Sequence, residues 1–366
     1  MMKLDLITNV VYILLFFNIF ALLIVFKEKK IETRGICFVI GFELLIGLAF
    51  RTLDQGLNDT KDVYLGMYEL ISNMDWNQIF QSDVCKMTSS LFVTILKLCS
   101  SLFFNNFRCL IMLFAFLFID SFERLICYYS DDAFMANLYF IAFFYPYGFF
   151  LMRQCLSMSF IAYSLCAMKS KKKKTAIVLL TLSGFIHSIA WLFILFLFIA
   201  YFFKKLIRDN IGLIKTVSTI VTVIIAFIPS TFLFLLDYLP ENSKYKILLL
   251  NNVYAVGDIW LAPLIMTAIQ IFIFWYFFKS QKNSYSVSCS ITSSFVAMIF
   301  TATTGIVQDM IRISYYFNIL CLILAGNIQN KRTTRRDNRY YRIFSILLIL
   351  YAFFVTLPNS NIIRWS

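Results

Sequence analysis

Charged residues are scarce in this sequence, and their scarcity separates it from soluble proteins. Asp, Glu, Lys and Arg make up 14% of the 366 residues, whereas soluble domains carry about a quarter. Histidine occurs once and proline five times, and no low-complexity linker is long enough to join separate domains. These features argue against a soluble multidomain protein, and we expect residues 1–366 to form a single integral-membrane domain.

Sequence motifs for metals and cofactors are also missing. The nine cysteines are scattered, several of them inside apolar runs, without a CxxC pair or a Cys/His cluster. We interpret them as small buried hydrophobic residues. The chain has no Walker A motif, no dinucleotide fingerprint, no HExxH and no GxSxG sequence. We therefore expect no metal and no cofactor.

Hydrophobic residues, in contrast, make up 60% of the chain, and the mean hydropathy is +0.78. Repeated apolar runs approach the ~20 residues that cross a bilayer as a helix. The runs do not alternate in polarity as barrel strands do, and inside lipid a helix satisfies its own backbone groups. The sequence predicts an all-α, polytopic transmembrane helical bundle with about ten crossing or re-entrant elements.

The positive charge is gathered in short clusters between the apolar runs. The net charge is +13, which by itself suggests a nucleic-acid partner. Short basic loops between spans instead mark the cytoplasmic face of a membrane protein, and no soluble domain is present to bind nucleic acid. The main clusters are Lys27 to Arg34, Lys169 to Lys174, Lys204 to Arg208 and Lys331 to Arg342.

Placing these clusters inside predicts the topology. The N-terminus and the stretch 51–87 then lie outside, and the latter is an extracytoplasmic loop that contributes to the active site. The expected spans cover about residues 6–26, 36–50, 107–125, 133–151, 153–168, 211–229, 258–278, 290–307, 313–328 and 343–357.

Two segments leave alternatives open. We expect residues 88–104 to lie at the membrane interface, because an odd number of crossings must connect the loop 51–87 to the basic cluster at 169–174. If 88–104 crosses, one of the neighbouring segments does not. Residues 175–203 have basic clusters at both ends, which favours two half-helices that meet near Gly184 and His187 and return. One long tilted span is the alternative.

This topology places Arg51, Arg153 and Arg312 at the outer ends of three different segments. Arginine is disfavoured there by the positive-inside bias, and at membrane depth it is costly without a partner. Guanidinium groups bind phosphate through two parallel hydrogen bonds, so three arginines on one face suit a lipid diphosphate. Pairing with a carboxylate or a lipid headgroup is the ordinary explanation for each one.

Four further residues are candidates for chemistry. Asp59 is a candidate general base toward a sugar hydroxyl, and Tyr64 and Tyr68, four residues apart, share one face of a helix. His187, the only histidine, is a candidate phosphate donor or proton acceptor. The alternatives are a helix cap for Asp59, interfacial packing for the tyrosines, and hydrogen-bonded packing for His187.

These residues, in order and spacing, resemble the EpsG family, which is related to Wzy-type polymerases of O-antigen and capsular polysaccharides. The similar blocks run through most of the chain, although Ser157 stands where the family often has Ala. They are Arg51, Gly56, Asp59, Tyr64 and Tyr68 in the first block; Arg153 and Gln154 in the second; Phe185, His187 and Ser188 in the third; and Arg312, Tyr315, Tyr316 and Phe317 in the last.

The resemblance implies a membrane glycosyltransferase of the bacterial plasma (inner) membrane, with its active site on the extracytoplasmic side. It would join undecaprenyl-diphosphate-linked repeat units into O-antigen, capsule or exopolysaccharide, without a cofactor. A flippase and a chain-length regulator are further candidate partners. In this reading, Asp59 or His187 accepts the proton. The substrate-binding residues would be Arg51, Arg153, Gln154, Arg312, Tyr64, Tyr68 and Tyr315.

Other functions remain as alternatives. A lipid-linked oligosaccharide flippase or another transporter predicts polar groups along a path through the membrane, whereas here they gather at one face. A different membrane glycosyltransferase of similar layout is another alternative. An O-acetyltransferase would need a catalytic histidine, for which His187 is the one candidate.

Overall fold

In the computed structural model, every element is a helix in the part of the chain that is described. That part comprises residues 2–29, 31–52, 59–82, 85, 88–227, 265, 267–272, 285–303, 310–327 and 335–357. It confirms the all-α prediction. The chain divides into two compact units, one formed by residues 1–194 and 348–366 and the other by residues 195–347.

The first unit carries most of the predicted site. Its helices are α1 (Met2–Glu28), α2 (Thr33–Ala49), the π-helix η1 (Asp59–Leu65), α3 (Gly66–Ser72), α4 (Trp76–Gln81), α6 (Ser90–Leu102), α7 (Phe107–Tyr129), α8 (Ala133–Phe143), the 3₁₀ helix η2 (Tyr145–Phe149), α9 (Met152–Lys169), α10 (Lys173–Ile186) and the π-helix η4 (Ala352–Thr356).

Two of the described helices are long and apolar enough to cross a membrane. They are Thr8–Glu28 within α1 and Arg339–Thr356 near the C-terminus, and several other apolar helices are shorter. The first matches the span expected at 6–26, and the second overlaps the one expected at 343–357. The larger number of crossings stays a prediction, as does the single domain over residues 1–366.

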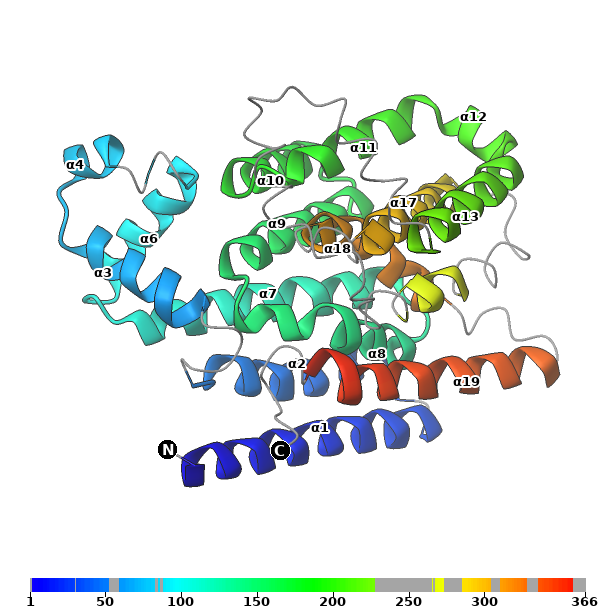
Figure 1. Cartoon of the computed structure of the whole chain (residues 1–366), viewed down its shortest axis with the longest axis horizontal. Coiled ribbons are helices and arrows are strands. Elements are labelled where there is room, and N and C mark those ends of the chain that lie inside the picture. The colour runs from blue at the N-terminus through cyan, green and yellow to red at the C-terminus, as the bar shows by residue number, and fades with distance from the viewer. Residues whose placement is uncertain are drawn as a thin grey trace. The chain divides into compact units, whose positions relative to one another are not determined.

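Helices α2, α7, α9 and α10 form the centre of the first unit, where α7 packs against α2 and α9, and α9 packs against α10 (Figure 1). Small polar residues allow α9 and α10 to approach closely. The Ser157 hydroxyl donates to the Ser183 carbonyl at 3.0 Å, and Ser164 donates to the Ala176 carbonyl at 2.9 Å. This register makes the two helices antiparallel, with Met152 and Ile186 at the same end.

Within its described residues, the predicted loop 51–87 contains the helices η1, α3 and α4. Side chains stabilise their ends. Lys97 of α6 donates to the carbonyls of Ile71, Ser72 and Met74 at 3.4, 3.0 and 2.7 Å, and so satisfies acceptors at the end of α3. The Asp75 and Gln78 pair forms a capping box at the start of α4.

Helix α6 covers the segment that we expected to lie at the interface. It has 13 residues, which gives a length of about 20 Å, and this is short of a ~30 Å hydrocarbon layer. Its buried residues, among them Phe92 and Leu96, lie on one face. The basic side chain of Lys97 within this apolar segment has a structural reason, the cap on α3.

The segment 133–151, expected as one span, is interrupted. Helix α8 ends at Phe143, and Tyr145–Phe149 form the 3₁₀ helix η2. Pro146 explains the change, because proline lacks an N–H and disfavours the α conformation of the residue before it. The Tyr145 hydroxyl donates to the Leu44 carbonyl at 3.0 Å, which attaches η2 to α2.

The segment 175–203 is broken at the predicted place. Helix α10 ends at Ile186, and α11 (Ala190–Phe202) starts after His187. The Trp191 ring lies so close to Gly184 that a Cβ there would meet it at 2.4 Å. Ser89 donates to the Ile186 carbonyl at 2.9 Å. The return of the second half-helix to the cytoplasmic side stays a prediction.

The second unit holds most of α11 and the helices that follow it. They are α12 (Lys204–Asp209), α13 (Ile211–Phe227), α17 (Tyr285–Thr303), α18 (Met310–Ala325) and most of α19 (Arg335–Tyr351). Helices α17 and α18 pack through small polar contacts, such as the 2.9 Å hydrogen bond from Ser293 to the Phe317 carbonyl. The expected external loop 230–257 lies outside the described residues.

Candidate active site

Arg51 lies just beyond the end of α2 and is almost completely buried, with 2% of its surface exposed. One guanidinium nitrogen, Nη1, donates to the Leu48 carbonyl at 3.3 Å. The guanidinium carbon lies 5.6 Å from the centre of the Phe149 ring of η2, a distance at which a cation–π interaction is favourable. The Phe149 ring therefore stabilises the positive charge of Arg51 at the junction between α2 and η2.

The other donors of Arg51 have no partner in the part of the chain that the structure describes. Both Nε and Nη2 are buried without a hydrogen bond, and no carboxylate there forms an ion pair with them. Burial lowers the pKa of Arg51 to about 10, so that the group stays charged at neutral pH. A buried, uncompensated charge is costly, and it suits an anionic ligand.

The π-helix η1 brings Thr60 and the predicted site residue Tyr64 to the segment around η2 and the start of α9. Thr60 donates through Oγ1 to the Phe149 carbonyl at 2.6 Å. The Tyr64 hydroxyl lies 3.5 Å from the Arg153 backbone nitrogen, from which it accepts a hydrogen bond. Arg51, Tyr64 and Arg153 therefore meet around the short segment that connects η2 to α9. Asp59 is the first residue of η1, and its side chain lies outside the described part.

Arg153 and Gln154 lie in the first turn of α9. The Arg153 side chain is partly exposed, and its guanidinium has no partner among the described residues, whereas Gln154 is buried. No side chain caps the start of α9. Backbone N–H groups and the helix dipole make such an end favourable for an anion. Arg153 and the start of α9 therefore carry positive charge a few residues after Phe149, the ring that the Arg51 guanidinium faces.

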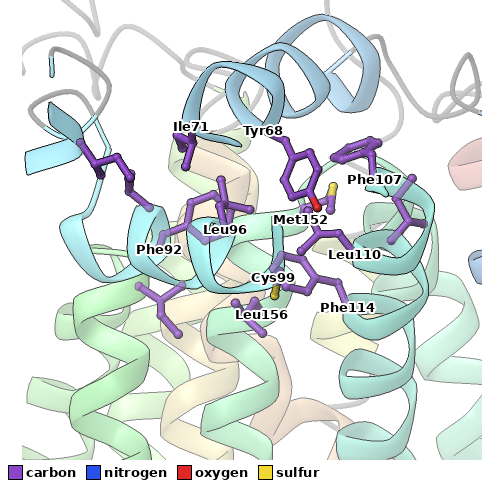
Figure 2. Close-up of a cluster of buried hydrophobic side chains, with 14 residues drawn as sticks. Tyr68, Ile71, Phe92, Leu96, Cys99, Phe107, Leu110, Phe114, Met152 and Leu156 are labelled. Atoms are coloured by element: carbon purple, nitrogen blue, oxygen red, sulfur yellow. The ribbon is translucent and has the colours of Figure 1, made fainter. Parts of the chain in front are cut away.

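Tyr68 has a different environment. It is 1% exposed within an apolar cluster to which α3, α4, α6, α7, α9 and α10 contribute. Its ring centre lies 5.4 Å from that of Phe107, and Figure 2 shows its hydroxyl pointing toward Met152. Burial raises the pKa of the Tyr68 phenol. The role in sugar binding stays a prediction.

His187 follows the last residue of α10 and is buried. Its backbone nitrogen donates to the Ser183 carbonyl at 3.0 Å. The preceding residue, Ile186, belongs to the same apolar cluster as Met152, so His187 lies toward the end of α10 that packs against the start of α9. Its role as a proton acceptor stays a prediction.

Arg312 and Tyr315 lie on α18 in the second unit. Arg312 is exposed in the first turn of the helix, and Tyr315 is fully buried. Each unit is described by itself. The convergence of Arg312 with the two arginines of the first unit therefore stays a prediction.

One arginine of the site was missed by the sequence analysis. Arg108 is the second residue of α7, and its Nη1 donates to the Arg51 carbonyl at 2.5 Å. The signal was present in the sequence, because Arg108 stands at the outer end of an expected span, as the other three arginines do.

Comparison with known proteins identifies one family. A sequence model described as the EpsG family matches residues 34–365, nearly the whole chain. No curated protein and no solved structure matches the chain.

Proposed function

This chain belongs to the EpsG family, and on that premise we propose that it polymerises lipid-linked oligosaccharide repeat units at the outer face of the plasma membrane. Family membership makes it a polysaccharide polymerase-like membrane protein. The proposed substrate is a growing glycan on undecaprenyl diphosphate, and the proposed acceptor is the sugar end of a newly delivered repeat unit.

The observation that supports this proposal is the buried Arg51 guanidinium, with two nitrogens free of any described partner. Arg153, at the uncapped start of α9, supplies a second guanidinium in the same unit. A transferase that releases a diphosphate needs positive charge where negative charge develops. Donors that are already in place stabilise that charge without reorganisation. Arg51 and Arg153 have the charge and the available N–H groups for this task.

In the proposed reaction, an acceptor hydroxyl attacks the anomeric carbon of the donor sugar. A carbon–oxygen bond to the acceptor forms, and the bond between the anomeric carbon and the phosphate oxygen breaks. Undecaprenyl diphosphate leaves with the bonding electron pair, stabilised by Arg51 and Arg153. The acceptor proton passes to Asp59 or His187, the two candidate general bases.

The test is the polymer itself, in a strain from which the gene is deleted and then restored on a plasmid. We expect the deletion to remove the polysaccharide ladder and to leave single capped repeat units, and the parent gene to restore the ladder. Single capped units distinguish a polymerase from a flippase, because loss of a flippase removes the capped unit as well. An unchanged ladder after deletion contradicts the proposed function.

Arg153→Ala tests the site in the same strain, with Arg124→Ala as the matched control. Arg124 is an exposed arginine of α7 that forms an ion pair with Asp120 at 2.6 Å, and such pairs contribute little to stability. We expect Arg153→Ala to abolish elongation at normal protein levels and Arg124→Ala to give normal ladders. Normal ladders from Arg153→Ala remove this residue from the site.

A further inference from the structure

Arg108 joins the start of α7 to the chain segment that follows α2. The side chain of Asn106 caps α7 by accepting a hydrogen bond from the Arg108 backbone nitrogen at 3.0 Å, which fixes the start of the helix. From there the guanidinium reaches across 57 residues of sequence to the Arg51 carbonyl. The position of the Arg51 main chain therefore depends on Arg108.

The two arginines lie close together without a described counter-charge. Besides burial, which is the largest cause, the positive charge of Arg108 contributes to the lowered pKa of Arg51. Arg108 is exposed, and among the described residues its hydrogen bonds use only its backbone nitrogen and Nη1. Its Nε and Nη2 remain as donors, and they lie on the guanidinium that contacts the Arg51 main chain.

Arg124 of the same helix shows what an ordinary arginine of α7 does. Its Nε lies 2.6 Å from the Asp120 carboxylate one turn away, which compensates its charge. Arg108 has no such carboxylate among the described residues and instead uses one donor on a backbone carbonyl. The charges of Arg108 and Arg51 repel each other, and an anion that binds both relieves the repulsion.

We propose that Arg108 is a third arginine of the diphosphate subsite, which holds Arg51 in position and binds the same anion through its remaining donors. The inference rests on the proposed function, because it assigns Arg108 to the leaving diphosphate of that reaction. The chemical class of ligand is a prenyl diphosphate. A prenyl monophosphate, with one phosphoryl group fewer, is expected to bind less tightly.

The test is direct binding of farnesyl diphosphate to the purified full-length chain in detergent, with farnesyl monophosphate as the comparison ligand. We expect Arg108→Gln to weaken diphosphate binding by about 10- to 100-fold, the loss of one or two charge-assisted hydrogen bonds. Arg108→Lys keeps the charge but loses the planar fork, and it should bind with intermediate affinity. Arg124→Gln should bind like the parent.

A purely structural role is separated from anion binding by thermal unfolding of the same variants without ligand. The inference expects Arg108→Lys to unfold like the parent and still to bind less tightly. If Arg108→Lys and Arg108→Gln both bind like the parent while Arg51→Ala does not, the inference is wrong and the proposed function stands. If the parent itself does not bind farnesyl diphosphate, the proposed diphosphate site is wrong as well.

Discussion

Arg51 and Tyr68 are the first and last residues of a polar stretch of the sequence, residues 51–68. They are buried to nearly the same extent, with 2% and 1% of their surfaces exposed. Both also keep polar atoms that have no hydrogen-bond partner among the described residues. Their surroundings differ. The Arg51 guanidinium contacts the Leu48 carbonyl and the Phe149 ring, whereas Tyr68 lies among the apolar side chains of the cluster in Figure 2.

The comparison shows that burial alone does not indicate a functional site. An unpaired neutral hydroxyl costs about 1–3 kcal/mol, an amount that the large apolar ring of Tyr68 offsets by its packing. An unpaired guanidinium costs several kcal/mol, and an equivalent packing gain is not available to a charged group. The unpartnered charge at Arg51 therefore has stronger functional meaning than the unpartnered phenol at Tyr68.

The largest expected effect follows from Arg51→Met. This substitution removes the charge that distinguishes Arg51 from the neutral, equally buried Tyr68. Replacing a buried unpaired charge by an apolar residue of similar size is neutral or stabilising. We therefore expect loss of the polysaccharide ladder together with an unchanged or higher unfolding temperature. Polymer gels and thermal unfolding of the purified protein measure the two effects. A normal ladder would show that the charge of Arg51 has no role.

The next effect concerns the end of α3, the helix that carries Tyr68. Lys97→Met removes a cation that donates to three carbonyls at the end of α3, and we expect a loss of about 1–3 kcal/mol of stability. Because the caps are local, the loss should appear as faster hydrogen exchange over residues 66–81 and not around Arg51. Lys174→Met, in the basic cluster 169–174, is the matched control. Equal exchange in both variants would contradict the capping role.

A smaller effect is expected from Tyr64→Phe. Tyr64 lies between the apolar cluster around Tyr68 and the start of α9 at Arg153. The variant keeps the ring that packs against Phe92 and removes the hydroxyl near the Arg153 backbone nitrogen. Because that hydrogen bond is long, we expect its loss to cost no more than ~1 kcal/mol, which corresponds to a reduction in polymer of a few-fold. Quantified ladders measure it. Complete loss of polymer would indicate that the hydroxyl contacts the substrate directly.

The smallest effect is expected from Tyr68→Phe. The hydroxyl has no partner among the described residues, so its removal deletes a desolvation cost and leaves the ring contacts with Phe107. We expect a normal ladder and a free energy of unfolding that is unchanged or raised by up to ~1 kcal/mol. A defect in polymer length would contradict this expectation and would support the predicted role of Tyr68 in sugar binding.

Local features of the sequence were sufficient for the class of protein and for part of the architecture. The hydropathy predicted an all-helical membrane protein, and the motif blocks predicted the EpsG family. The break at His187 was also predicted, because basic clusters at both ends of one apolar segment favour it over a single span. Each of these predictions depends on composition or on residues that are near one another in the sequence.

The amino-acid sequence was therefore sufficient for the class, the family and the identity of the charged residues near the ends of the apolar segments. Only the tertiary structure decided which of them meet. Arg108 reaches Arg51 across 57 residues, and Tyr64 reaches Arg153 across 89. The tertiary structure also showed that Arg51 and Tyr68, both buried, have different surroundings. The physical reason is that these contacts depend on how α2, α7 and α9 pack together, and local hydropathy contains no information on that packing.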